Sequence, residues 1–248
     1  HFCHICHLIL TPKYEKHHSF GENKMMNKKL MAAVVAASAA LTGCGSDTET
    51  VTQTYLEKLL ESNPMTTVTA DDGCAEFGGD FTDDTNTVCA LPTRITATGG
   101  ELDSTITYRL YGVTLLGYGD VQLETASDVS YIKQNPVELT IPAGTTIEGK
   151  AGSALVVTRG AVLDAEGTEA SPIIFESEDD NLTGSSEWGG LVVQGFGISN
   201  KCPDTGICNV LGEGGVGYYG GDDNADSSGS LEYVIVTEGG YEVSVDNE

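Results

Sequence analysis

Histidine is missing from most of this 248-residue chain, because all five histidines lie within the first eighteen residues. They are His1, His4, His7, His17 and His18. The rest of the chain therefore cannot form a Ser-His-Asp triad, a Cys-His dyad or a histidine-ligated zinc site. No Cys-x-x-Cys pair occurs after residue 18 either, which argues against a redox-active thiol centre.

Basic side chains are scarce: the chain has 12 Lys and Arg against 37 Asp and Glu, a net charge of −25. Residues 1–44 hold five lysines and two glutamates, so the remainder has seven basic and 35 acidic residues, a net charge of −28. Such an acidic chain repels phosphate backbones, and we expect no nucleic-acid partner. The excess of acid has two explanations, namely solubility and the binding of hard divalent cations such as calcium.

Long hydrophobic runs are lacking as well. The longest, residues 30–41, would extend about 18 Å as a helix, against roughly 30 Å of bilayer hydrocarbon. It follows Lys28-Lys29 and ends in Leu41-Thr42-Gly43-Cys44. This order of basic, apolar and small residues resembles the signal peptide of a bacterial lipoprotein, which is cleaved before the cysteine of its lipobox.

This resemblance implies how the leader is divided. A start at Met25 or Met26 makes residues 25–43 the signal peptide, and residues 1–24 are then not expected in the product. Cys3-His4-Ile5-Cys6-His7 matches the pattern of covalent haem attachment. Because that pattern precedes the export signal, we expect no haem, and calcium is the only cofactor that the rest of the sequence suggests.

The same resemblance implies that Cys44 carries the lipid anchor. One acyl chain attaches a protein only marginally, at about 0.8 kcal/mol per buried methylene, so stable attachment takes two or more chains. In Gram-negative lipoproteins an aspartate directly after the cysteine commonly retains the protein at the inner membrane. Here Gly45 follows and the first acid is Asp47, so we expect the outer membrane.

Four cysteines follow Cys44, an even number for an oxidising compartment. Their spacing favours two local disulfides, Cys74–Cys89 and Cys202–Cys208, although the other two ways of pairing them remain open. The first would close a loop of about fifteen residues and stabilise the fold by roughly 3 kcal/mol. We expect structural disulfides and not catalytic thiols.

The segment after the anchor divides in two. Residues 44–66 are expected to be a lipidated tether with a short helix, because Leu56, Leu59 and Leu60 share one helical face and Pro64 ends it. Residues 67–94 are acidic and rich in glycine, and we expect a surface loop held by its cysteines.

From Ile95 onward the chain consists of short apolar runs separated by Gly, Pro, Asn or Asp. We expect strands at 95–98, 106–111, 139–141, 155–157, 161–163, 173–175, 191–193 and 231–236. A sandwich would need hairpin turns, and Asn-Gly or Asp-Gly signals are missing between these runs. A recurring apolar triplet, glycine corner and second triplet instead favour an all-β solenoid, a right-handed parallel β-helix over residues 95–248.

Four phrases, at residues 140–149, 153–161, 170–175 and 187–195, resemble surface-attached β-helix lipoproteins of marine and environmental Gram-negative bacteria. That family carries no assigned reaction, so the resemblance implies architecture and not chemistry. Its members usually continue further, and we therefore expect a truncated sequence whose β-helix is incomplete at the carboxyl end.

One loop has the pattern of an ion site. Asp222, Asn224 and Asp226 alternate as in an EF-hand, but Ser227 replaces the required glycine and Tyr233 stands where the bidentate glutamate belongs. The loop is therefore not an EF-hand, and it is either a calcium site of another kind or a solvated turn. Residues 178–181, Glu-Asp-Asp-Asn, are a second candidate of the same type.

We expect a non-enzymatic module that binds a polysaccharide or another surface ligand, and we single out no catalytic residue. The alternative is a carbohydrate-active enzyme: a lyase would need a base beside calcium, and a hydrolase two opposed carboxylates. Arg159 follows a strand and could lie on an outer face beside an acid. Trp188, Tyr218 and Tyr219 could stack on sugar, although a tryptophan next to Gly-Gly more often fills a corner of the core.

Overall fold

The computed structural model describes residues 53–68, 73–179 and 184–241, which belong to one compact unit, Thr52–Glu248. The expected signal peptide and Cys44 lie outside the described residues, so both stay predictions. No described helix has the length and hydrophobicity that a bilayer-crossing segment requires.

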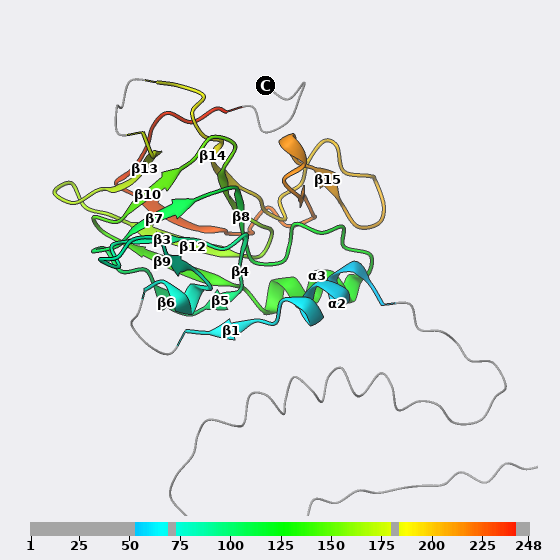
Figure 1. The fold of residues 1–248 in the computed structure, drawn as a ribbon. Helices are drawn as coiled ribbons and strands as arrows, with labels where there is room; N and C mark the ends of the chain where they lie inside the picture. The colour runs from blue at the N-terminus through cyan, green and yellow to red at the C-terminus, as the bar shows by residue number, and fades with distance from the viewer. Residues whose placement is uncertain (1–52, 69–72, 180–183, 242–248) are drawn as a thin grey trace, which may run out of the picture. The chain divides into compact units, whose positions relative to one another are not determined.

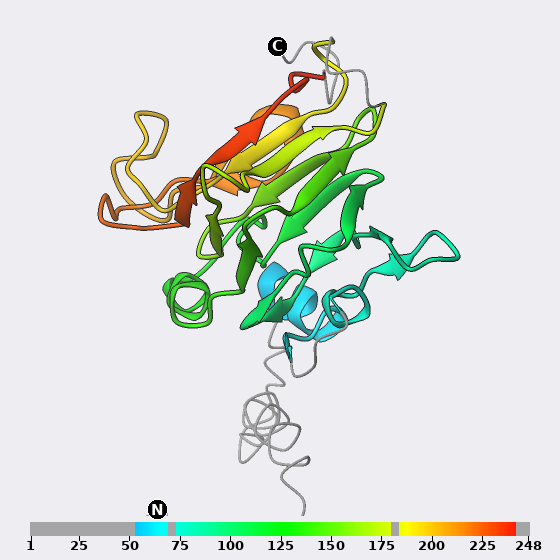
Figure 2. The ribbon, with the colours of Figure 1, turned by 90° about the vertical axis from the view of Figure 1, so that its left-hand side faces the viewer.

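Three sheets of short strands, numbered sheets 1 to 3 here, form the body of this unit (Figures 1 and 2). Sheet 1 consists of β2 (Asp80–Phe81), β3 (Val88–Ala90), β7 (Thr107–Leu110), β10 (Thr146–Gly149), β13 (Ile173–Ser177) and β18 (Val234–Val236). Sheet 2 consists of β4 (Arg94–Ile95), β8 (Val113–Leu116), β11 (Ala154–Val157) and β14 (Gly190–Val193). Sheet 3 consists of β6 (Gly100–Glu101), β9 (Glu138–Pro142), β12 (Val162–Glu166) and β17 (Gly229–Glu232).

The chain visits the three sheets in turn and then returns to the first. It runs β7, β8, β9, then β10, β11, β12, then β13, β14, β17, and comes back to sheet 1 in β18. Each of these strands pairs in parallel with the equivalent strand of the neighbouring coil. Within the three sheets of the described residues, β2 alone pairs antiparallel, with β3, and outside them β15 and β16 also pair antiparallel. The expected all-β class and parallel pairing are thus confirmed. The strands β7 to β14 of these sheets do not pair through hairpins, as the strands of a sandwich would.

The core consists of inward side chains stacked from coil to coil. In sheet 1, Ile147 pairs with Tyr108 on one side and Phe175 on the other, and all three are fully buried. Leu139 and Leu163 form a second stack, in sheet 3. Each fully buried aliphatic or aromatic side chain contributes about 1.5–3 kcal/mol. Alternation within each short strand thus builds continuous apolar ladders along the coil axis.

Two helices and two small strand pairs complete the described unit. Helix α2 (Tyr55–Ser62) has a capping box from Thr54 and Glu57, and it ends before Pro64, as predicted. Helix α3 (Ala126–Gln134) was not expected; Thr125 and Asp128 cap it in the same way. Thr54 Oγ1 donates to Asp128 Oδ1 at 3.1 Å, so the two helices begin side by side (Figure 1). The strand pairs are β1 (Thr66–Thr67) with β5 (Ala97–Thr98), and β15 (Val210–Leu211) with β16 (Tyr218–Tyr219).

The parallel ladder begins earlier than residue 95. Strand β3 already pairs in parallel with β7, and its Cys89 forms a disulfide with Cys74. The second predicted disulfide, Cys202–Cys208, is present as well. The expected run 231–236 is divided between β17 and β18 by Tyr233, whose φ of 48° turns the chain from sheet 3 to sheet 1.

Candidate functional site

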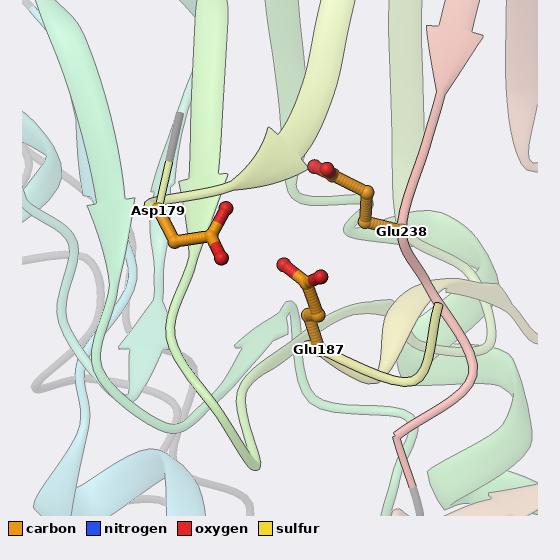
Figure 3. A group of neighbouring side chains, drawn as sticks. All are labelled: Asp179, Glu187 and Glu238. Atoms are coloured by element: carbon orange, nitrogen blue, oxygen red, sulfur yellow. The ribbon is translucent and has the colours of Figure 1, made fainter. Parts of the chain in front are cut away.

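Three carboxylates meet at the corner between sheets 1 and 2 (Figure 3). Asp179 follows β13, Glu187 precedes β14, and Glu238 follows β18 in the next coil. One oxygen of each side chain lies within 4.8 Å of the other two. We call these three residues the corner acids. The expected segment 178–181 contributes only Asp179 here, because residues 180–181 lie outside the described part of the chain.

The backbone holds Glu238 firmly in the corner. Its side chain is 8 % exposed, and Oε2 accepts a hydrogen bond of 3.0 Å from the N–H of Ser177. The N–H of Glu187 donates to the carbonyl of Glu238 at 2.9 Å, which joins the two coils directly. Oε1 of Glu238 and Oε2 of Glu187 are buried without a hydrogen-bond partner among the described residues. A buried carboxylate oxygen without a donor is costly, since it has lost its water.

A row of ion pairs lies on the neighbouring strands of sheet 1. Arg109 on β7 pairs with Glu148 on β10 and approaches Glu178 at 3.4 Å, and Lys150 approaches Glu178 at 2.6 Å. Burial lowers the pKa of the Arg109 guanidinium, but the contacts with Glu148 outweigh it and the net shift is upward. Arg109 therefore stays charged and paired with Glu148 and Glu178.

The predicted calcium residues lie elsewhere, between β16 and β17. Oδ1 of Asn224 accepts from the N–H of Ile198 at 2.9 Å, and Oδ2 of Asp226 accepts from the N–H of Phe196 at 2.7 Å. Asp222 is exposed. In the structure, Asn224 and Asp226 hold residues 196–198 in place, and whether the loop also binds calcium stays a prediction.

Sequence reasoning missed the part that Asp223 plays. Its Oδ2 lies 3.1 Å from Nζ of Lys133, which reaches it from α3, and Lys133 also lies over the ring of Phe196. The hydrogen bond from Lys133 is the main cause that lowers the pKa of Asp223. The partners are ninety residues apart and α3 was not expected, so no local signal pointed to this contact.

The same loop borders a hollow of about 330 Å³. Polar side chains dominate its lining, with one aromatic ring from β16: Ser199, Tyr219, Asp223, Asn224, Asp226 and Ser228. Hydroxyl, amide and carboxylate groups around an aromatic ring are a combination that suits a sugar.

A family model for the pectate-lyase-like β-helix domain matches residues 123–248, which is half of the chain. The chain belongs to this family. Searches of the curated proteins and of the solved structures gave no match. In this β-helix chain the parallel ladder extends upstream of the matched residues, since β3 and β4 already pair with β7 and β8.

Arg159 of the β-helix is fully buried, and it does not lie on an outer face beside an acid as expected. Its guanidinium donates to backbone carbonyls of Gly119, Val121, Cys208 and Gly220 and to the side chain of Asn209. The ring of Phe196 lies 5.5 Å away. Burial lowers its pKa to about 10, against the attraction of Asp120, so the group is charged at neutral pH.

Trp188 fills a corner of the core, as its surroundings in the sequence indicated. It is fully buried, and the site of a Cβ on Gly149 would lie 2.5 Å from its ring. It is therefore not accessible for stacking on a sugar.

Proposed function

We propose that this chain is an extracellular binding module: a right-handed β-helix, held at the outer membrane by lipid on Cys44, that binds a polysaccharide or another surface ligand without transforming it. The parallel coil and the family support the scaffold. Right-handedness follows the nearly universal hand of parallel crossover connections. The Leu41-Thr42-Gly43-Cys44 sequence supports the anchor.

One observation carries the binding function: every arginine of the chain is already engaged. Arg94 forms a bidentate pair with Asp120, Arg109 pairs with Glu148, and Arg159 is buried among carbonyls. A lyase of uronate polymers needs a base that is free to face the substrate. With no arginine available for that role, binding is better supported than a lyase reaction that uses an arginine base.

The hollow beside Tyr219 is the ligand site that we propose. Tyr219 would stack on a sugar ring, while Ser199, Asn224 and Ser228 would exchange hydrogen bonds with its hydroxyls. The strongly acidic character of the chain favours a neutral glycan over a polyuronate.

A panel of neutral and acidic polysaccharides tests this proposal. Calorimetry should detect binding of a neutral glycan, and neither unsaturated products nor new reducing ends should accumulate. Tyr219→Ala should weaken binding about tenfold, whereas Tyr55→Ala, which removes an exposed ring from α2, should not. Absence of binding across the panel, or equal binding by both variants, would contradict the proposal.

A carbohydrate-active enzyme is the second candidate, favoured by the family and by the corner acids. Two carboxyl groups about 5 Å apart suit a retaining hydrolase. Product formation in the same panel, lost in Glu187→Gln, would establish this alternative.

The anchor and the calcium loop need tests of their own. Palmitate should label the wild-type protein and not Cys44→Ala, and membrane fractionation should find the label in the outer membrane. For the loop, we propose calcium held by Asp222, Asn224 and Asp226. Asp222→Asn should lower calcium affinity without changing the melting temperature in chelator, because this side chain is exposed.

A further inference from the structure

Two of the corner acids have oxygens that the described residues leave unsatisfied. Glu238 is more than nine-tenths buried, yet its Oε1 accepts no hydrogen bond from the described residues, and neither does Oε2 of Glu187. Figure 3 shows both carboxylates directed into the space that Asp179 also borders. Asp179 is exposed and Glu187 half-buried, so Glu238 is the buried member of the group. Bringing two further carboxylates up to a buried one is unfavourable unless something positive joins them.

We propose that Asp179, Glu187 and Glu238 bind a calcium ion. Calcium takes six to eight oxygen ligands at about 2.3–2.6 Å, so two oxygens on opposite sides of one ion lie at most about 5 Å apart. The oxygens of the corner acids all lie within 4.8 Å of one another, inside that limit. Three carboxylates without histidine or cysteine favour a hard cation, and water would complete the coordination.

The ion would join two successive coils. Asp179 and Glu187 come from the connection between β13 and β14, and Glu238 comes from the next coil, after β18. Backbone hydrogen bonds already align these segments: the N–H of Ser186 donates to Gly239 at 3.0 Å, and that of Glu187 to Glu238 at 2.9 Å. Calcium at this corner would stabilise the last described coil against separating from the one before it.

This site is distinct from the 222–226 loop. In that loop Asn224 and Asp226 each use an oxygen to accept a backbone N–H, whereas the corner has two buried oxygens that no described residue supplies with a donor. The two sites share no residue, so variants can separate them.

The test uses the full chain, freed of metal by chelator and then titrated with calcium chloride in a calorimeter. We expect one site that depends on the corner acids: Glu238→Gln, which keeps the shape of the side chain, should weaken calcium binding by about tenfold or more. Glu169→Gln, an exposed acid outside the corner, and Asp222→Asn should leave this site unchanged. Terbium in place of calcium should give emission on selective excitation of Trp188, the only tryptophan and the neighbour of Glu187, and calcium should abolish it.

The melting temperature supplies a second readout with opposite signs. In chelator, Glu238→Gln should melt higher than wild type, because it removes one of the mutually repelling charges. In calcium it should melt lower, because it has lost a ligand. If Glu238→Gln does not fold, Glu187→Gln should show the same reversal.

Either of two results would overturn the site. One is wild-type protein that shows neither calcium heat nor a calcium-dependent shift in melting temperature. The other is calcium affinity in Glu238→Gln and Glu187→Gln that equals that of Glu169→Gln.

Discussion

The indole N–H of Trp188 donates a hydrogen bond to the backbone carbonyl of Thr237, with 2.8 Å between nitrogen and oxygen. Thr237 belongs to the coil after that of Trp188, while Gly149, under the indole ring, belongs to the coil before it. One side chain thus joins three successive coils at the corner between sheets 1 and 2. The corner acids are built on this arrangement, because Glu187 and Glu238 are the immediate neighbours of Trp188 and Thr237 in the chain.

Gly149→Ala should destabilise the fold by about 1–3 kcal/mol, because the new methyl group would lie 2.5 Å from the indole ring of Trp188 and overpack the core. Urea unfolding followed by circular dichroism measures the change. Gly112→Ala is the matched control, since a Cβ there meets no atom of the described residues within 4 Å. Equal stability of the two variants would show that the corner has room to adjust.

Arg159→Met should cost about 3 kcal/mol or more in the free energy of unfolding. The side chain would still fill space, but the buried carbonyls of Gly119, Cys208 and Gly220 would lose their donor. Lys201→Met, at an exposed position, should stay within about 0.5 kcal/mol of wild type. A stable Arg159→Met would mean that water replaces the guanidinium.

Removing the Cys74–Cys89 disulfide should destabilise more than removing Cys202–Cys208. The sequence separations are 15 and 6 residues, which correspond to about 3 and 2 kcal/mol in the loop-entropy treatment. Double Cys→Ser variants and their melting temperatures test the order. The reverse order would show that Cys202–Cys208 stabilises the folded state through its packing against Gly220, in addition to restricting the unfolded chain.

Asp83→Asn should lower the melting temperature at neutral pH and have less effect in acid. Hydrogen bonds from the Thr85 hydroxyl, and then from the N–H of Val88, hold the pKa of Asp83 well below its usual range. A depressed pKa in the folded state gives stability that is complete above the unfolded value, about 3.9, and is lost as the pH falls through the folded value.

Melting curves recorded between pH 7 and pH 2 measure how the effect of Asp83→Asn on the melting temperature changes with pH. Asp84→Asn, at an exposed position next in the chain, is the control and should melt like wild type throughout. If the difference in melting temperature between Asp83→Asn and wild type stayed constant with pH, the amide would destabilise the fold for a reason other than the lost charge.

Much of the fold was readable from local patterns. Apolar triplets between glycine corners predicted most strands, such as β11 and β13, because alternation and turn chemistry act over only a few residues. The short spacing of the cysteines predicted both disulfides. Strand β8 and helix α3 were not predicted. The apolar residues of β8 do not fit the recurring triplet and glycine corner by which the other strands were recognised. Helix α3 buries only Asp128 and Ile132, so its sequence has little helical periodicity to detect.

By itself the sequence determined that this is an acidic chain of short strands with no histidine after residue 18, and it favoured two local disulfides and parallel pairing, which the structure confirmed. Only the tertiary structure decided that Arg159 is buried, that Asp223 meets Lys133, and that Glu187 and Glu238 converge. The physical reason is the register of one coil on the next. That register is set by the packing of whole ladders of core side chains, and it brings together residues whose separation in the chain carries no local signal.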